Sequence, residues 1–282
     1  RPAVADFLAE RGETVAARGL FPGIFLDSIR FPSPAADPAY LGCFCPYCTR
    51  LAADRSLDLE SVRRALEATL TRAHGPERIA RGLFAPGIDP DLDLLLDFRR
   101  ERVTRMVQSA SQQAAGLGLA VGLDCFTPSL TRMVGQDLAA LDGTCRWIKI
   151  MSYPRVYGPA GISFELHGLA SWLIARGVDE ARALRIVAEA SGLKIPKSLS
   201  GLRRAGLGPG ALAAEIARGS AAGVANLLAG LALVEMEGVH ESTPEQIRAD
   251  VEASRAANGI VLSWDLWLTP LETLDTIRSI WQ

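Results

Sequence analysis

Short hydrophobic runs alternate with longer amphipathic segments along most of the chain. The short runs are nearly continuous and are bounded by glycine or proline, which is typical of strands covered on both faces of a parallel sheet. Between them, apolar residues recur at three- and four-residue spacing, which predicts helices. The expected strands are 23–32, 117–128, 146–154, 226–238 and 259–270. The expected helices are 2–19, 57–75, 91–116 and 129–143, then helices within 164–190 and 210–221, then 243–259 and 271–282.

This alternation predicts an α/β fold with parallel strands and right-handed crossovers. Each predicted strand carries a polar residue near its carboxyl end: Asp27, Asp124, Tyr153, Glu235 and Asp265. A (β/α)8 TIM barrel builds its active site at this end of its strands. We therefore predict an α/β (β/α)8 barrel with these polar residues at its mouth.

Composition places few further limits on the class of protein. The chain has 282 residues, 49% hydrophobic and 22% charged, with a formal net charge of −2. We expect a single domain over 1–282, since barrels of about 250 residues commonly fold as one unit. A basic stripe with interleaved aromatic residues is absent, and so is an apolar run of the ~18 residues that a membrane span needs. The sequence also lacks GxGxxG and P-loop motifs, so we expect no nucleic-acid partner, no membrane span and no nucleotide cofactor.

Seven motifs follow one another in the chain: GIFLDSIRFPSP, CFCPYC, FRRERV, VGQDLAAL, WIKIMSYP, GPAG and GIVLSWDL. Together they resemble bacterial TIM-barrel proteins related to the family-10-like glycosyl hydrolases, over about residues 20–270. The resemblance implies that 23–32 corresponds to barrel strand four and that the later strands correspond to strands five through eight. It also implies that 33–90 is an inserted loop and helical region that carries the cysteine motif.

Strands one to three have no counterpart in this alignment of motifs, and five parallel strands cannot close a barrel. The chain also opens RPAVADFLAERGE, without a methionine and without the apolar core of a signal peptide. We therefore expect a chain that is incomplete at its N-terminus, with the missing strands absent or supplied by another chain. Cytoplasmic and secreted locations both stay open.

Glycoside hydrolysis generally uses two carboxyl groups that flank the scissile bond. The resemblance implies that Asp27, at strand four, and Glu235, at strand seven, form this catalytic pair. Asp124 is a third acid, and like-charge repulsion from it would raise the pKa of one carboxyl enough for an acid role. Alternatively, Asp27 accepts backbone N–H bonds or pairs with Arg30.

Other residues at the strand ends are expected to bind substrate. The guanidinium of Arg30 has the planar geometry that holds a carboxylate, either Asp27 or an acidic sugar. Tyr153 can donate to a substrate hydroxyl, and Trp264, beside Asp265, offers a flat surface for a sugar ring. For Tyr153 and Trp264, simple packing at the barrel mouth is the alternative.

Lys149 lies on the same strand face as Trp147 and Tyr153. If that face points into the barrel, Lys149 is buried among apolar layers and its pKa falls. A neutral buried lysine is the nucleophile of Schiff-base aldolases. The plainer interpretation, which we favour, is that Asp124 or another acid in the barrel pairs with Lys149.

Cys43, Cys45 and Cys48 lie within six residues, and His74 follows after 25 more. This spacing is compatible with a tetrahedral Cys3His zinc site. A disulfide within the cluster and free thiols are the alternatives. Cys125 and Cys145 fall in or beside strands, where we expect packing roles.

These observations predict a hydrolase that acts on a poly- or oligosaccharide through paired carboxylates. A structural zinc ion is the one cofactor that the sequence suggests. Two other functions stay open: a barrel that binds glycan or cell-wall material without catalysis, and a Schiff-base lyase or aldolase centred on Lys149.

Overall fold

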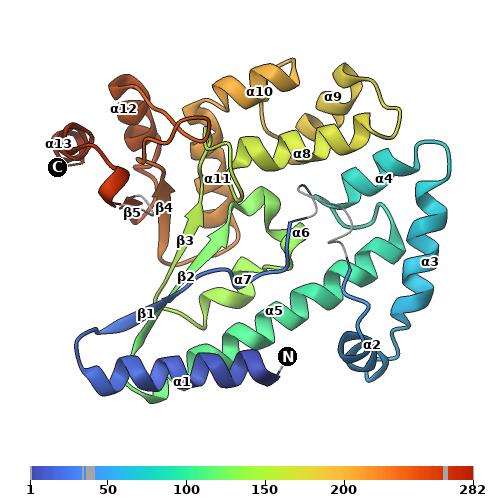
Figure 1. Cartoon of the computed structure of the whole chain (residues 1–282), viewed down its shortest axis with the longest axis horizontal. Coiled ribbons are helices and arrows are strands. Elements are labelled where there is room, and N and C mark those ends of the chain that lie inside the picture. Colours follow the sequence, from blue (N-terminus) through green and yellow to red (C-terminus); the bar gives the residue numbers. More distant parts are fainter. Residues whose placement is uncertain (1, 34, 36–41, 263–265, 282) are drawn as a thin grey trace.

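A five-stranded parallel sheet forms the centre of the protein (Figure 1). The structure, a computed structural model, describes residues 2–33, 35, 42–262 and 266–281. The strands are β1 Gly23–Leu26, β2 Ala120–Phe126, β3 Trp147–Met151, β4 Leu227–Leu231 and β5 Gly259–Leu262. They lie in the sheet in chain order, and every neighbouring pair is parallel. Each predicted strand contains one of these strands, which confirms the α/β prediction.

Helices connect the strands and precede and follow the sheet. They are α1 Pro2–Arg18, α2 Pro46–Ala53, α3 Leu59–Leu70, α4 Gly75–Gly82, α5 Pro90–Gly116, α6 Thr131–Val134, α7 Leu138–Asp142, α8 Ile162–Ile174, α9 Glu180–Ser191, α10 Leu199–Ala205, α11 Pro209–Ala221, α12 Pro244–Ala253 and α13 Leu271–Ile280. The sequence patterns missed α2, α4 and α10, because these helices are too short to show a clear periodicity. The longest helix, α5, matches its prediction within one residue.

Strong local signals determine where α5 begins and ends. Asp89 caps the helix by accepting the Leu92 N–H at 3.1 Å, and Pro90 takes the first position, where no donor is needed. At the other end, Gly118 has φ +77°, a conformation that favours glycine. The helix packs against β2 and lies beside α1 (Figure 1).

The two faces of the sheet differ in what covers them. One face packs into a hydrophobic core with α5, α7, α11 and α12; its strand residues include Leu26, Val121, Leu123, Cys125, Ile148, Ile150, Leu227, Ala229 and Leu231. The residues that alternate with these form what we call the second face: Phe25, Gly122, Asp124, Trp147, Lys149, Leu228 and Gly230. The helices thus lie against one face, and the polar strand residues point from the other.

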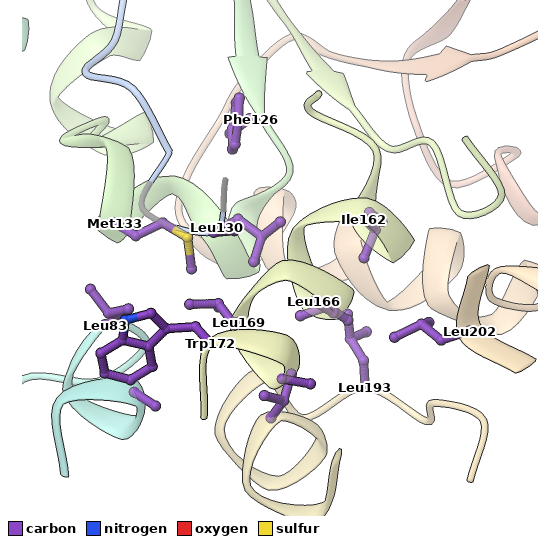
Figure 2. Close-up of a cluster of buried hydrophobic side chains, with 14 of the residues drawn as sticks. Leu83, Phe126, Leu130, Met133, Ile162, Leu166, Leu169, Trp172, Leu193 and Leu202 are labelled. Carbon is purple, nitrogen blue, oxygen red and sulfur yellow. The ribbon is translucent and has the colours of Figure 1, made fainter. Parts of the chain in front are cut away.

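A second hydrophobic core lies beyond the carboxyl ends of the strands (Figure 2). Phe126, at the end of β2, packs there with Leu130 and Met133. Leu166 and Trp172 of α8 contribute from the other side. This core holds the ends of β2 and β3 in place, and these ends carry the candidate site.

The sheet does not close on itself over the described residues, since β1 and β5 each pair with a single strand. Strands in chain order with helices against one face are the arrangement of a barrel wall. The structure therefore shows an α/β protein with a parallel sheet, and the eight-stranded barrel stays a prediction. Within the described ranges, no helix is both long and apolar enough to cross a membrane.

We expect Leu123→Ala to lower the free energy of unfolding by about 2–5 kcal/mol, because Leu123 is fully buried against the helices. Urea denaturation followed by circular dichroism measures this change. Leu20→Ala, at a side chain that is 72% exposed, is the matched control and should change stability by less than ~0.5 kcal/mol. Equal effects of the two variants would contradict the assignment of the core.

Candidate functional site

A buried ion pair lies on the second face of the sheet, near the carboxyl ends of β2 and β3. Lys149 Nζ is 2.7 Å from Asp124 Oδ2, and the two residues are only 6% and 7% exposed. They are direct partners in the register of the two strands. The Lys149 ammonium also lies 5.2 Å from the ring centroid of Tyr153, within the range of a cation–π contact. Lys149 is thus paired as the plainer interpretation of the sequence predicts.

Gly230 on β4 provides the space for the Lys149 side chain. A Cβ atom at this position would lie 2.7 Å from Lys149 Cε and 3.2 Å from Tyr153 Cε1. Both distances are shorter than ordinary van der Waals contact. Because Gly230 has no side chain, β4 leaves the room in which Lys149 extends to Asp124.

Burial and charge together raise the pKa values of both groups, but for different reasons. Burial raises the pKa of Asp124 to about 6, Lys149 opposes this rise, and Asp27 adds to it. Burial alone would lower the pKa of Lys149, but Tyr153 and Asp124 outweigh it and raise the pKa. The lowered lysine pKa expected from burial alone is therefore wrong. Lys149 therefore keeps its proton near neutral pH, whereas the pKa of Asp124 lies just below neutral pH.

Asp124 also has an oxygen that the ion pair does not use. Its Oδ1 is buried and has no hydrogen-bond partner among the described residues. Buried carboxylate oxygens are nearly always satisfied, so an unpartnered one marks a position of chemical interest. A proton or a substrate hydroxyl at Oδ1 would not disturb the bond from Lys149 to Oδ2.

Asp27 and Arg30 follow β1 in a tight turn. The Ser28 N–H donates to Asp27 Oδ1 at 2.5 Å, and Ser28 itself has φ +58°. The turn brings the Arg30 guanidinium over the ring of Phe126, with its Cζ 4.4 Å from the centroid. Burial lowers the pKa of Arg30, and the nearby carboxylates Glu165, Asp27 and Asp124 oppose this. Asp27, Arg30 and Asp124 thus form one cluster of charges.

Glu165 is a member of this cluster that the sequence patterns did not indicate. It lies in the first turn of α8, is 1% exposed, and accepts the Ala160 N–H at 2.9 Å and the Ser33 hydroxyl. Burial raises its pKa. An acid inside an apolar helical segment has no distinctive spacing; the preceding GPAG turn was the one available signal. We assign Glu165 an electrostatic role opposite Arg30.

Glu235 lies in a different environment from Asp27. The predicted strand 226–238 ends at Leu231, and Glu235 is exposed in the loop beyond it, where its N–H donates to Leu268 O at 2.9 Å. Burial lowers the pKa of His240, and Glu235 is among the groups that oppose this. The structure therefore groups Asp27 with Asp124, and it places Glu235 with His240. Trp264 and Asp265, two predicted substrate contacts, lie outside the described residues.

The three cysteines of the CFCPYC motif gather at the start of α2. Their Sγ atoms all lie within 4.8 Å of one another, and those of Cys43 and Cys45 are 3.4 Å apart. All five cysteines are free thiols. The backbone N–H of Cys48 lowers the pKa of Cys45 to about 6, whereas burial raises the pKa of Cys48 to about 12. Three sulfur ligands at this spacing can bind a metal ion such as zinc.

His74 does not join these cysteines, which corrects the predicted Cys3His ligand set. It precedes α4, and its Nδ1 lies 3.2 Å from Glu77 Oε1 and 3.2 Å from Arg182 Nη2. The 12-residue helix α3 separates it along the chain from the cysteines. A spacing of 25 residues therefore did not bring this histidine to the metal site.

Comparison of the chain with protein-family models, with curated proteins and with solved structures finds no match. Any assignment of function therefore depends on the chemistry of the residues described above.

We expect Lys149→Met to raise the pKa of Asp124 above about 7, because the cation that favours the ionised carboxylate is removed. Carbon-13 NMR titration of the aspartate carboxyls measures this, with Asp124→Asn assigning the resonance. Lys197→Met, at an exposed lysine, is the control and should leave the resonance unchanged. An Asp124 pKa that stays near 6 in Lys149→Met would show that the ion pair does not tune it.

Proposed function

We propose that the protein is a glycoside hydrolase and that Asp124 and Asp27 are its paired carboxyl groups. We also propose that the parallel sheet is part of a (β/α)8 barrel. The observation that carries the proposal is the environment of Asp124: a buried carboxyl with a pKa of about 6, beside the exposed Asp27, at the carboxyl end of a parallel sheet. Glycosidases use such a pair, in which one carboxyl keeps its proton near neutral pH.

In this proposal Asp124 is the general acid. Its Oδ1 gives a proton to the glycosidic oxygen as the bond to the sugar breaks. The ammonium of Lys149, bound to Oδ2, then stabilises the carboxylate that remains. Asp27, as a carboxylate, either attacks the sugar carbon or takes a proton from the attacking water, and the separation of the two carboxyls decides which.

The Schiff-base alternative is less compatible with the geometry. A lysine nucleophile must lose its proton, and the raised pKa of Lys149 opposes this. The glycan-binding alternative uses the same site without bond cleavage, so only an activity measurement separates it from the hydrolase.

We expect the protein to release reducing ends from at least one member of a broad polysaccharide and oligosaccharide panel. Asp27→Asn and Asp124→Asn should each lower the rate by ~10³-fold or more, because each removes one of the paired carboxyls. Activity should also fall as the pH rises through about 6, since the acid form of Asp124 is lost.

Glu235→Gln is the matched variant in this experiment and should keep more than about a tenth of the activity. A loss in Glu235→Gln as large as in Asp27→Asn would instead favour the pair Asp27 and Glu235. Binding of a glycan with no release, unchanged in Asp27→Asn, would replace the hydrolase by the binding protein.

We further propose that Cys43, Cys45 and Cys48 bind one zinc ion. Zinc–sulfur bonds of about 2.3 Å in a tetrahedron place the sulfur atoms roughly 3.8 Å apart. The observed Sγ separations, all within 4.8 Å, fit one ion. An iron–sulfur cluster spreads its thiolates over separate iron atoms and fits this spacing less well.

We expect about one zinc ion per chain in protein purified without chelator, measured by elemental mass spectrometry. Cys43→Ser and Cys48→Ser should each lower the zinc content several-fold, because each removes a thiolate. Cys145→Ser, outside the cluster, and His74→Ala should leave it unchanged. Zinc well below one ion per chain in the unaltered protein would overturn the assignment.

A further inference from the structure

A pocket of about 450 Å³ opens beside the three cysteines. All three cysteines line it, together with Arg30 from the turn after β1 and Arg102 and Arg105 from α5. Phe31 and Met106 contribute apolar walls. The pocket therefore combines soft metal ligands with several cations.

Arg102 and Arg105, on the α5 side of this pocket, share a single carboxylate partner with Arg55. Arg102 Nη2 lies 3.3 Å from Glu101 Oε1, Arg105 Nε lies 2.9 Å from the same oxygen, and Arg55 also contacts Glu101. One carboxylate thus faces three guanidinium groups. A cluster with such an excess of cations favours an anionic ligand.

Two of the arginines, Arg30 and Arg102, also carry a buried Nε donor. The Nε atoms of Arg30 and Arg102 are buried, and neither has a hydrogen-bond partner in the described part of the chain. Buried guanidinium donors are costly to leave unpaired. Both residues line the pocket, so their guanidinium groups lie beside any anion bound there.

Among the described residues, the three cysteines fill three of the four positions around a tetrahedral zinc ion. Structural zinc sites have four protein ligands, whereas sites that take an exogenous ligand have three. Among the described residues, the cysteines form a group of three, without a histidine or carboxylate as the fourth ligand. The pocket lies directly against this group.

We propose that the pocket binds a carboxylate-bearing ligand, one oxygen of which completes the coordination of zinc while Arg30 and Arg102 hold its charge. This inference rests on the zinc site proposed above. A carboxylate fits because its two oxygens reach a metal and a planar guanidinium at once. Arg30 also reaches the strand-end site, so an acidic sugar is one source of the carboxylate and a small organic acid is the other.

The test uses the full chain loaded with Co²⁺ in place of zinc, because the visible absorption of cobalt reports its ligands. Metal content is measured first. Acetate and glucuronate should each produce a saturable change in the cobalt bands, whereas glucose should not. A response to both acids with equal affinity indicates a small carboxylate, and a response that is at least tenfold tighter for glucuronate indicates an acidic sugar.

Arg102→Gln and the more exposed Arg105→Gln should each weaken this binding about tenfold, and Arg64→Gln, on the exposed side of α3, should not. If neither acid changes the cobalt spectrum, the inference is overturned, but the metal site is not. A stronger response to inorganic phosphate than to either acid overturns the carboxylate assignment. A chain that binds neither cobalt nor zinc overturns both the metal site and the ligand.

Discussion

The candidate site depends on the ion pair between Lys149 and Asp124, which are almost completely buried. Buried charges are costly unless they are paired with good geometry, and removing one partner from a buried pair generally costs about 3–5 kcal/mol. The pair exists because the parallel register of β2 and β3 sets the two residues opposite each other. A slip of one residue would turn either side chain into the helix-covered face. Gly230 then leaves the room that the lysine needs.

The same pair determines which chemistry the site can carry. Burial acts on both groups, but the carboxyl and the amine respond differently once they are paired. The pKa of Asp124 ends near 6, where it can give a proton, and the pKa of Lys149 ends above its usual value, where it cannot act as a neutral amine. In the proposed hydrolase, this environment favours acid catalysis by Asp124 over covalent catalysis by Lys149. Asp27 and Arg30 extend the site from β1 through their turn.

The cysteine cluster is connected to this site through one short segment. Ser28 and Ile29 separate Asp27 from residues 30–32, which form one side of the pocket beside the three cysteines. Arg99 of α5 holds this segment, because its guanidinium donates to Pro32 O at 3.0 Å and lies over Phe31. A ligand in the cysteine pocket and a substrate at the strand ends would therefore meet the same arginine, Arg30.

The sequence by itself determined the features that depend on residues close together along the chain. Hydrophobic periodicity located the five strands of the sheet and the long helix α5, whose start the structure shows to be capped by Asp89. The sequence put three cysteines within six residues, but an extended segment of that length spans roughly 17 Å, so the turn into α2 is what gathers the thiols. Only the tertiary structure decided the relations between distant residues. It left His74 away from the cysteines, brought the unnoticed Glu165 toward Arg30, and set Asp124 near the charge of Asp27. It also decided between the two interpretations of Lys149, since the direction of its pKa shift depends on distances to Tyr153 and Asp124 that no sequence pattern contains.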